Sequence, residues 1–276
     1  MEKILPSDIK QLTLVARHEL FRFTRGWRLP AVLGIVLLIS GLIIAIPQIM
    51  NYRVPDDPKE YFRTFAGFAS ILALICATFF GADAIVSEYQ NRTGYVIFPA
   101  PVRRETLFSG KFIASFIACM IALGLYYLIG SIATLYFTGK GSISILQSFL
   151  LASLYMWALL SVAFLISSLM KGTTASNVLV FVLFLMIFPI AESMLSLAGV
   201  EPSAIPTYSG NTITDILSDP YPVTSKQVIP IGRNNTTMTV WDFHPTLAQG
   251  IGVLLAYGIT STALAVYIFK KREMSG

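Results

Sequence analysis

The chemically richest part of the chain is a charged, turn-rich stretch at residues 83–111. Its charged groups include one acid and three arginines: Glu88, Arg92, Arg103 and Arg104. It ends in Gly110-Lys111, the pair that closes a phosphate-binding loop when a glycine stands five residues earlier and a hydroxyl residue follows. Glu105 and Phe112 occupy those two positions. The chain therefore does not bind ATP through such a loop.

Other catalytic arrangements also lack their residues. His18 and His244 are the two histidines of the chain, and the topology given below puts them on opposite sides of a membrane, which excludes a zinc site or a Ser-His-Asp triad. Asp83 and Glu192 are the acids near predicted spans, but they lie toward opposite faces, unlike the paired acids of an intramembrane aspartyl protease. We expect Asp83 to end a span and pair with a base. Glu192 either lines a substrate path or marks the outer interface.

Composition indicates an integral membrane protein. The 276 residues are 55% hydrophobic and 13% charged, whereas soluble domains carry about 25% charged residues. The net charge of +5 fits loops facing anionic lipid, and we expect no nucleic-acid partner because no basic patch carries exposed aromatic residues. Cys76 and Cys119 lie in apolar runs, so they form neither a disulfide framework nor a metal site.

Six uncharged intervals are long enough to cross a bilayer as helices. They are residues 29–52, 64–82, 112–139, 141–170, 172–191 and 245–269. With the N-terminus inside, 14 of the 20 Lys and Arg residues fall on the cytoplasmic side. We therefore predict a multi-pass protein of the plasma membrane with both termini in the cytoplasm.

The segments outside the spans have their own patterns. Residues 1–28 contain an amphipathic pattern from Ile9 to Trp27, which predicts a helix on the membrane surface or, alternatively, only a basic flank that sets topology. Residues 199–244 form a large extracellular loop rich in proline. Two β-prone runs around residues 232–235 predict a hairpin within it, and overlapping glycosylation sequons begin at Asn234 and Asn235.

With the spans placed, residues 83–111 resemble the cytoplasmic loop after the second span in permease subunits of type-2 ATP-binding-cassette transporters. The likeness rests on Asp83-x-Ile85-x-x-Glu88, Thr93-Gly94, Pro101-x-Arg103 and Gly110-Lys111-Phe112. It covers the whole chain in layout and about thirty residues in sequence. It implies one permease domain over residues 1–276, six transmembrane helices in an all-α integral membrane fold, and no catalytic residues of its own.

The resemblance also implies partners. They are a second permease copy or paralogue and cytoplasmic ATP-binding subunits, which would bind the ATP and Mg and drive export, so the chain itself needs no cofactor. Five residues inherit contact with the ATPase: Glu88, Tyr89, Gln90, Asn91 and Arg92. Arg103 and Arg104 also belong to the implied ATPase-coupling residues and would begin the helix that leads into span three. A topogenic basic loop without a partner is the alternative.

The cargo and a second function stay open at this stage. Glu192, Tyr126, Tyr155 and Trp157 are candidates for a substrate path, although aromatic residues in spans more often pack against other helices. As an alternative function, the chain would be a membrane anchor or assembly factor whose outer loop holds an extracytoplasmic protein.

Overall fold

The computed structural model describes residues 8–52, 54–90, 103–231 and 236–272, with backbone alone for 227–231 and 236–240. Asn91, Arg92, Asn234 and Asn235, on which predictions above depend, lie outside these residues. The described helices and strands are α1 (Asp8–Arg25), α2 (Arg28–Ile49), α3 (Pro58–Gly81), α4 (Val86–Gln90), α6 (Arg104–Thr138), α7 (Ile143–Leu169), α8 (Thr173–Val182), η1 (Leu183–Ile187), α9 (Phe188–Leu197), α10 (Pro206–Gly210), α11 (Thr212–Asp215), β1 (Ser225–Ile231), β2 (Thr236–Asp242) and α12 (Leu247–Lys271).

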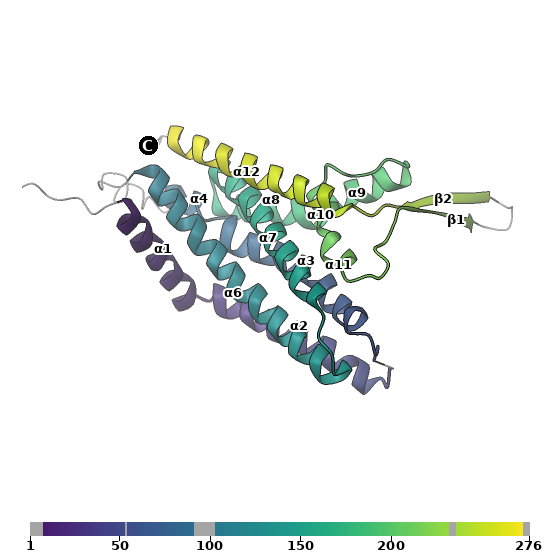
Figure 1. The fold of residues 1–276 in the computed structure, drawn as a ribbon. Coiled ribbons are helices and arrows are strands. Elements are labelled where there is room, and N and C mark those ends of the chain that lie inside the picture. The colour runs from purple at the N-terminus through teal and green to yellow at the C-terminus, as the bar shows by residue number, and fades with distance from the viewer. Residues whose placement is uncertain (1–7, 53, 91–102, 232–235, 273–276) are drawn as a thin grey trace, which may run out of the picture.

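Six helical stretches are long and apolar enough to cross a membrane, which confirms the six predicted spans. They are α2, α3 with α4, α6, α7, the run from α8 to α9, and α12. Two ends of the bundle can be named by what they carry (Figure 1). The termini end holds α1, α4 and the end of α12. The hairpin end holds β1, β2, α10 and α11.

Local sequence explains where the helices start and stop. Asp57 caps α3 by accepting from the backbone N–H of Lys59, and Pro58 occupies the first turn, where its missing N–H costs nothing. Thr246 and Gln249 form a reciprocal capping box at the start of α12. Gly139 ends α6 in the left-handed region, with φ of 67°, a conformation that glycine adopts without strain.

Span five contains a widened turn. Its central part, η1, is a π-helix directly before Phe188 and Pro189. A proline inside a helix lacks the N–H for the ladder and clashes with the carbonyl four residues earlier, so the turn before it opens. The span thus remains continuous from α8 to α9 despite the proline.

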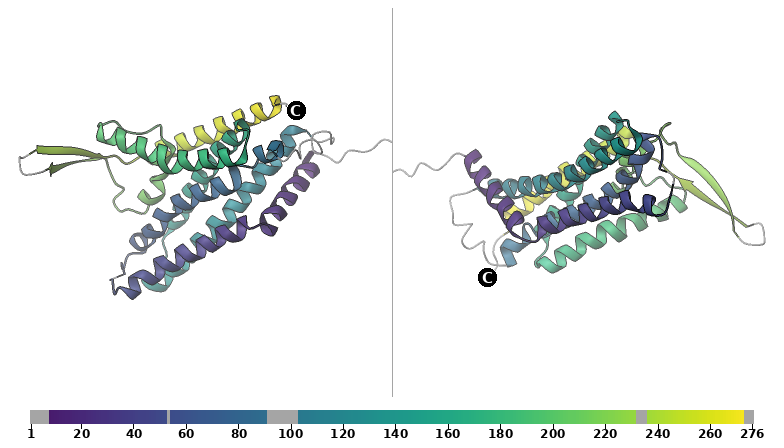
Figure 2. Two further views of the ribbon diagram at one scale, coloured as in Figure 1. Left: turned by 180° about the vertical axis from the view of Figure 1, so that it is seen from behind. Right: turned by 90° about the horizontal axis from the view of Figure 1, so that it is seen from below.

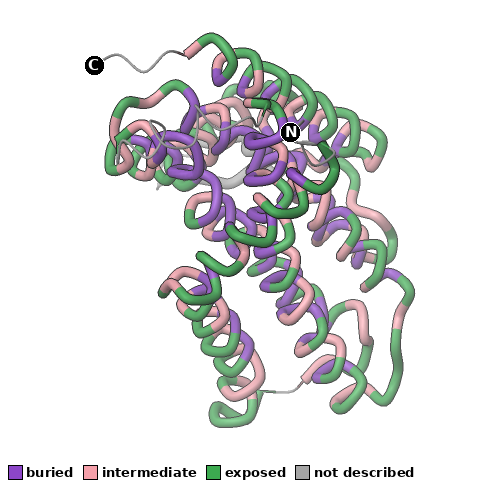
Figure 3. Tube along the Cα trace, turned by 90° about the vertical axis from the view of Figure 1, so that its left-hand side faces the viewer, coloured by how far each residue is buried: buried purple, intermediate pink, exposed green. Residues whose placement is uncertain are grey.

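The core of the bundle lies where α7 packs against α3 and α12 and where α6 packs against α3 (Figures 1 and 2). Close approach depends on small residues. Gly81 of α3 faces Ala163 of α7, and Gly258 of α12 faces the ring of Trp157. Helix α2 and the α8–α9 span bury few residues, and exposed large apolar side chains occur on both, such as Leu38 and Phe181. In Figure 3 the buried residues concentrate where helices pack together.

The region after span two differs from a simple loop. The segment 83–111 begins with a turn and the short helix α4, and from Arg104 it is already part of α6. The predicted third span, which started at residue 112, is therefore eight residues too short. The uncharged interval misplaced its start because Lys111 lies inside the helix with its charge compensated, as described below. The prediction that Arg103 and Arg104 begin this helix is confirmed, since Arg103 is its N-cap.

The N-terminal helix forms as predicted, over Asp8–Arg25. Its apolar stripe packs on α6, where Val15 lies so close to Gly110 that a Cβ there would be 2.7 Å from its side chain. This stripe therefore contacts protein, and the exposed residues, including Leu14 and Phe21, are those left for a membrane surface.

At the other end, the predicted hairpin is confirmed: β1 and β2 pair antiparallel from Ser225 opposite Asp242 to Ile231 opposite Thr236. Both views in Figure 2 show it extending away from the helices. Between the spans and the hairpin, α10 and α11 insert into the bundle, where Tyr208 and Ile213 are fully buried. Apart from this hairpin, the regular structure of the described chain is helical, as expected for the all-α class.

Candidate functional site

Three charged side chains from three helices meet in the interior of the termini end. The ammonium of Lys111, on α6, donates to the carboxylate of Glu88, on α4, at 2.6 Å, and it also donates to the carboxylate of Glu19, on α1. Each of the three residues exposes 5% or less of its surface. We call Glu19, Lys111 and Glu88 the charge cluster.

The charge cluster is neutralised locally. Arg22 lies 2.8 Å from Glu19 and 3.8 Å from the Glu88 carboxylate, so two acids face two bases. Arg22 is partly exposed and faces the surface, whereas Lys111 lies within. Removing charges from water costs several kcal/mol per ion, and only close pairing offsets that cost. Removing one member alone therefore leaves an uncompensated buried charge and weakens the contact between α1, α4 and α6.

A second ion pair lies beside it. The guanidinium of Arg28, at the start of α2, forms a bidentate salt bridge with the carboxylate of Asp83. One of its two hydrogen bonds measures 2.7 Å. Asp83 lies in the turn between α3 and α4 and is buried. The expectation that Asp83 pairs with a nearby base is confirmed.

The turn from α3 to α4 is fixed to spans four and five by serine side chains. The hydroxyl of Ser167, on α7, accepts from the backbone N–H groups of Ile85 and Val86 at 3.0 and 3.1 Å. The hydroxyl of Ser176, on α8, donates to the carbonyl of Ala82. These contacts satisfy backbone groups that the turn leaves outside the helix ladder. They connect the turn before α4, and the start of α4, to α7 and α8.

The end of α4 contacts three more helix ends. The side-chain carbonyl of Gln90 accepts from the backbone N–H of Thr173 at 2.6 Å, which caps the start of α8. The guanidinium of Arg272, just beyond α12, lies 4.2 Å from the ring centroid of Tyr89. The same guanidinium donates to the carbonyls of Ser168 and Met170 at 2.7 Å each. Tyr89 and Gln90 thus connect α4 to α7, α8 and α12.

The two arginines that open α6 have different partners. Arg104 donates to the carbonyls of Lys270 and Arg272 at 2.9 Å, which fixes α6 to the end of α12. Arg103 pairs with Asp8 of α1 at 3.4 Å, with both side chains largely exposed. An exposed pair of this kind contributes at most about 1 kcal/mol.

The structure thus brings together Glu88, Tyr89, Gln90, Arg103 and Arg104 of the predicted coupling residues. It also places the Glu88 carboxylate against Lys111 inside the protein and away from solvent. Sequence analysis missed the partners Glu19 and Lys111. A usable signal was present for one of them, because Glu19 follows Ala16 by three residues and precedes Phe23 by four, so it falls on the buried face of α1.

Of the candidates for a substrate path, Tyr126 and Trp157 pack on α3 and α12, whereas Tyr155 and Glu192 both lie against residues 206–211. Tyr126 is buried and donates to the carbonyl of Phe65 at 2.9 Å, and Trp157 packs on Gly258. Tyr155 is buried against Gly210 of α10. Glu192 accepts from the side chains of Thr207 and Asn211 at 2.9 and 3.2 Å, so it joins α9 to α10 and α11. Packing or hydrogen bonds account for each of the four, and their role in a substrate path stays a prediction.

The hairpin end contains one perturbed carboxyl group. Asp215 of α11 is buried and lies 3.0 Å from Nδ1 of His244. Burial raises the pKa of Asp215 above its ordinary value, and the contact with His244 acts in the opposite direction. This pair joins α11 to the segment between β2 and α12.

Within the described residues, no group of three or more His, Cys, Asp and Glu side chains could hold a metal ion. The candidate functional feature of the termini end is a set of ion pairs and hydrogen bonds that connect several helix ends.

Comparison with protein families gives a match to the ABC-2 family transporter protein model over residues 13–274. No curated protein matches the chain.

Proposed function

Because this chain belongs to the ABC-2 family of transporter proteins, we propose that it is the permease subunit of an ATP-driven exporter. In this proposal two permeases, either identical copies or paralogues, form the substrate pathway within the membrane. Separate cytoplasmic subunits bind ATP and Mg and hydrolyse the nucleotide. The chain itself is not an enzyme, and its termini end faces the cytoplasm.

The observation that supports this proposal most is the charge cluster. A partner that pushes on the segment after span two acts on α4, and α4 is bonded to α1 and α6 through Glu88 and Lys111. Interlocked helices of this kind move as rigid bodies, as coupled transport requires. We assign Glu88 a positioning role: it holds α4 in place, and residues on the surface of the segment meet the ATPase.

The test is co-purification with an ATPase subunit encoded by a neighbouring reading frame. Glu88→Lys places a second ammonium beside Lys111, so we expect the ATPase to be lost from the purified complex. Glu60→Lys is the matched control, since Glu60 is an exposed acid in the first turn of α3, at the other end of the bundle. It should retain the ATPase.

A second variant distinguishes loss of coupling from loss of folding. Glu88→Gln combined with Lys111→Met removes one acid and one base, and it leaves Glu19 paired with Arg22. We expect this variant to fold and to bind the ATPase but to transmit less of its motion. A preparation that never retains an ATPase, and that transports cargo without nucleotide, contradicts the proposal.

A second function, as an anchor for an extracytoplasmic protein, draws support from the hairpin that extends from the bundle (Figure 1). Its base carries Trp241, with the ammonium of Lys226 5.3 Å from the ring centroid. Replacing residues 225–242 by a short flexible linker keeps α10 and α11 and should abolish capture of such a partner. Unchanged capture excludes the hairpin as its binding site.

A further inference from the structure

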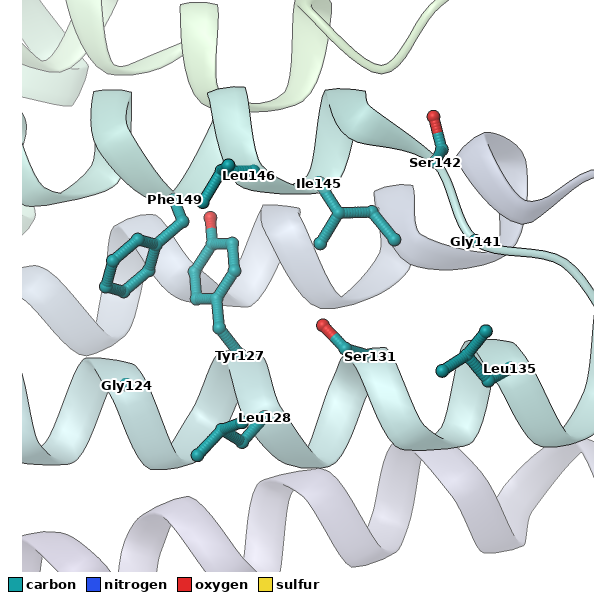
Figure 4. Close-up of a pocket in the computed structure, with 10 residues that line it drawn as sticks. All are labelled: Gly124, Tyr127, Leu128, Ser131, Leu135, Gly141, Ser142, Ile145, Leu146 and Phe149. Carbon is teal, nitrogen blue, oxygen red and sulfur yellow. The ribbon is translucent and has the colours of Figure 1, made fainter.

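A groove of about 410 Å³ runs between α6 and α7 toward the hairpin end (Figure 4). Tyr127 and Ser131 point from α6 toward α7, and Ile145 and Phe149 point back from α7. This volume lies within the range of about 300–1,000 Å³ common for ligand sites. The groove is separate from the charge cluster and from the segment assigned to coupling.

The surface of the groove is largely apolar, and the hydroxyl of Tyr127 within it already has a partner. The hydroxyl of Tyr127 is hydrogen-bonded to that of Ser148 at 3.0 Å, and Ser148 in turn donates to the carbonyl of Ile213 at 2.8 Å. The Tyr127 ring packs against Phe149 with centroids 5.2 Å apart. Tyr127 thus lines the groove together with aliphatic side chains.

The groove opens sideways, toward the surroundings of the spans. At its edges, Leu128 of α6 is 61% exposed and Leu146 of α7 is 53% exposed. Both belong to helices of membrane-spanning length and composition. In a bilayer, this opening therefore faces the acyl chains of the lipids.

A lysine precedes the residues that line the end of the groove. The turn from α6 to α7 contributes Gly141 and Ser142 to the lining, and Lys140 precedes them, exposed. None of the ion pairs found among the described residues involves Lys140. Tyr136, 81% exposed one turn earlier, is an aromatic residue of the kind found at membrane interfaces.

We propose that this groove binds one phospholipid, with an acyl chain against Tyr127 and Phe149 and the phosphate beside Lys140. The arrangement matches an amphiphile in both parts, since the apolar channel lies along the spans and Lys140 lies exposed in the turn between α6 and α7, where the spans end. In the predicted orientation, the lipid belongs to the outer leaflet. The proposal concerns a bound lipid and does not depend on ATP-driven export.

The test uses the full chain in nanodiscs that contain phosphatidylglycerol with a photoactivatable group in the acyl chain. Cross-linked peptides are then identified by mass spectrometry. Gly124→Leu fills the groove, since a Cβ at Gly124 meets nothing within 4 Å. Gly252→Leu is the matched control, because Gly252 of α12 is equally open and lies outside the lining.

We expect cross-links to concentrate on the peptides that contain Leu128 and Leu146. In Gly124→Leu this yield should fall about tenfold, which corresponds to about 1.4 kcal/mol, and in Gly252→Leu it should not change. Phosphatidylglycerol should label better than phosphatidylcholine, and Lys140→Gln should remove that preference while leaving the acyl contact.

Three results overturn the proposal. Labelling spread evenly over all lipid-facing helices indicates ordinary bilayer contact only. Labelling that Gly124→Leu does not reduce places the lipid elsewhere. Peptides of the groove that stay unlabelled in a complex of two copies, but are labelled in the single chain, assign the groove to a protein interface.

Discussion

Replacing Lys111 by methionine tests the charge cluster directly. Methionine keeps most of the side-chain volume and removes the ammonium, so Glu19 and Glu88 lose the cation that lies between them. Arg22 cannot replace it fully, since it lies 3.8 Å from the Glu88 carboxylate. We expect a large loss of stability from this one substitution.

The size of the loss follows from the geometry. At 2.6 Å and an effective dielectric constant of about 20, the attraction between Lys111 and Glu88 alone is about 6 kcal/mol. Desolvation of the ions offsets part of it, and removing one partner of a buried pair costs about 3–5 kcal/mol in measured cases. A chain of this size loses about 2–4 °C of melting temperature per kcal/mol, so we expect a fall of about 10 °C.

The assay is thermal unfolding of the purified chain in detergent. Lys140→Met is the matched control, since Lys140 is exposed and should tolerate the change within about 0.5 kcal/mol. Adding Glu19→Gln and Glu88→Gln to Lys111→Met removes the uncompensated acids and should restore at least half of the lost stability. The reasoning is refuted if Lys111→Met melts like Lys140→Met, or if the triple variant is the least stable of all.

Three further substitutions probe other parts of the fold. Gly258→Ala should destabilise the chain by about 1–3 kcal/mol, because a Cβ would lie 2.0 Å from the Trp157 ring, whereas Gly252→Ala, with open space around it, should be neutral or stabilising in the same melting assay. Ser167→Ala should cost about 1–3 kcal/mol, measured by denaturant unfolding, because two buried backbone N–H groups lose their acceptor; an unchanged midpoint contradicts this assignment. Asp215 has a raised pKa, so the folded chain keeps a proton that the unfolded chain has released, and the contribution of this group to stability falls as the pH rises from about 4 through the raised pKa. Relative to Asp215→Asn, the wild-type chain should therefore lose stability over that range, and a relative gain refutes the burial argument.

The membrane architecture could be predicted because it depends on local properties of the sequence, namely the length of apolar runs and the position of turn residues. Apolar length gave the six spans, and turn residues around 232–235 gave the hairpin. Charge misleads about where helices begin: Lys111 lies inside α6, and α3 likewise begins before its uncharged interval, at Pro58. A lysine can enter a helix bundle when acids from other helices meet it, and that compensation involves residues 92 and 23 positions away in sequence.

The candidate site was predicted only in part for the same reason. The sequence indicated that Glu88 matters, but it could not indicate that its carboxylate faces inward, because this depends on how α1 packs against α6. That Tyr126 and Trp157 contact other helices than Glu192 does also follows from packing between spans. Pairings across helices are set by three-dimensional contact, and a single sequence carries little trace of them.

The most direct test of the central claim is the rate of ATP hydrolysis by the partner ATPase in nanodiscs, with and without this chain. We predict that the wild-type chain and Glu60→Lys change that rate equally. Glu88→Gln with Lys111→Met should bind the ATPase but leave its rate close to that of the ATPase alone. If this variant changes the rate as fully as the wild-type chain does, the charge cluster does not couple the ATPase to the membrane helices.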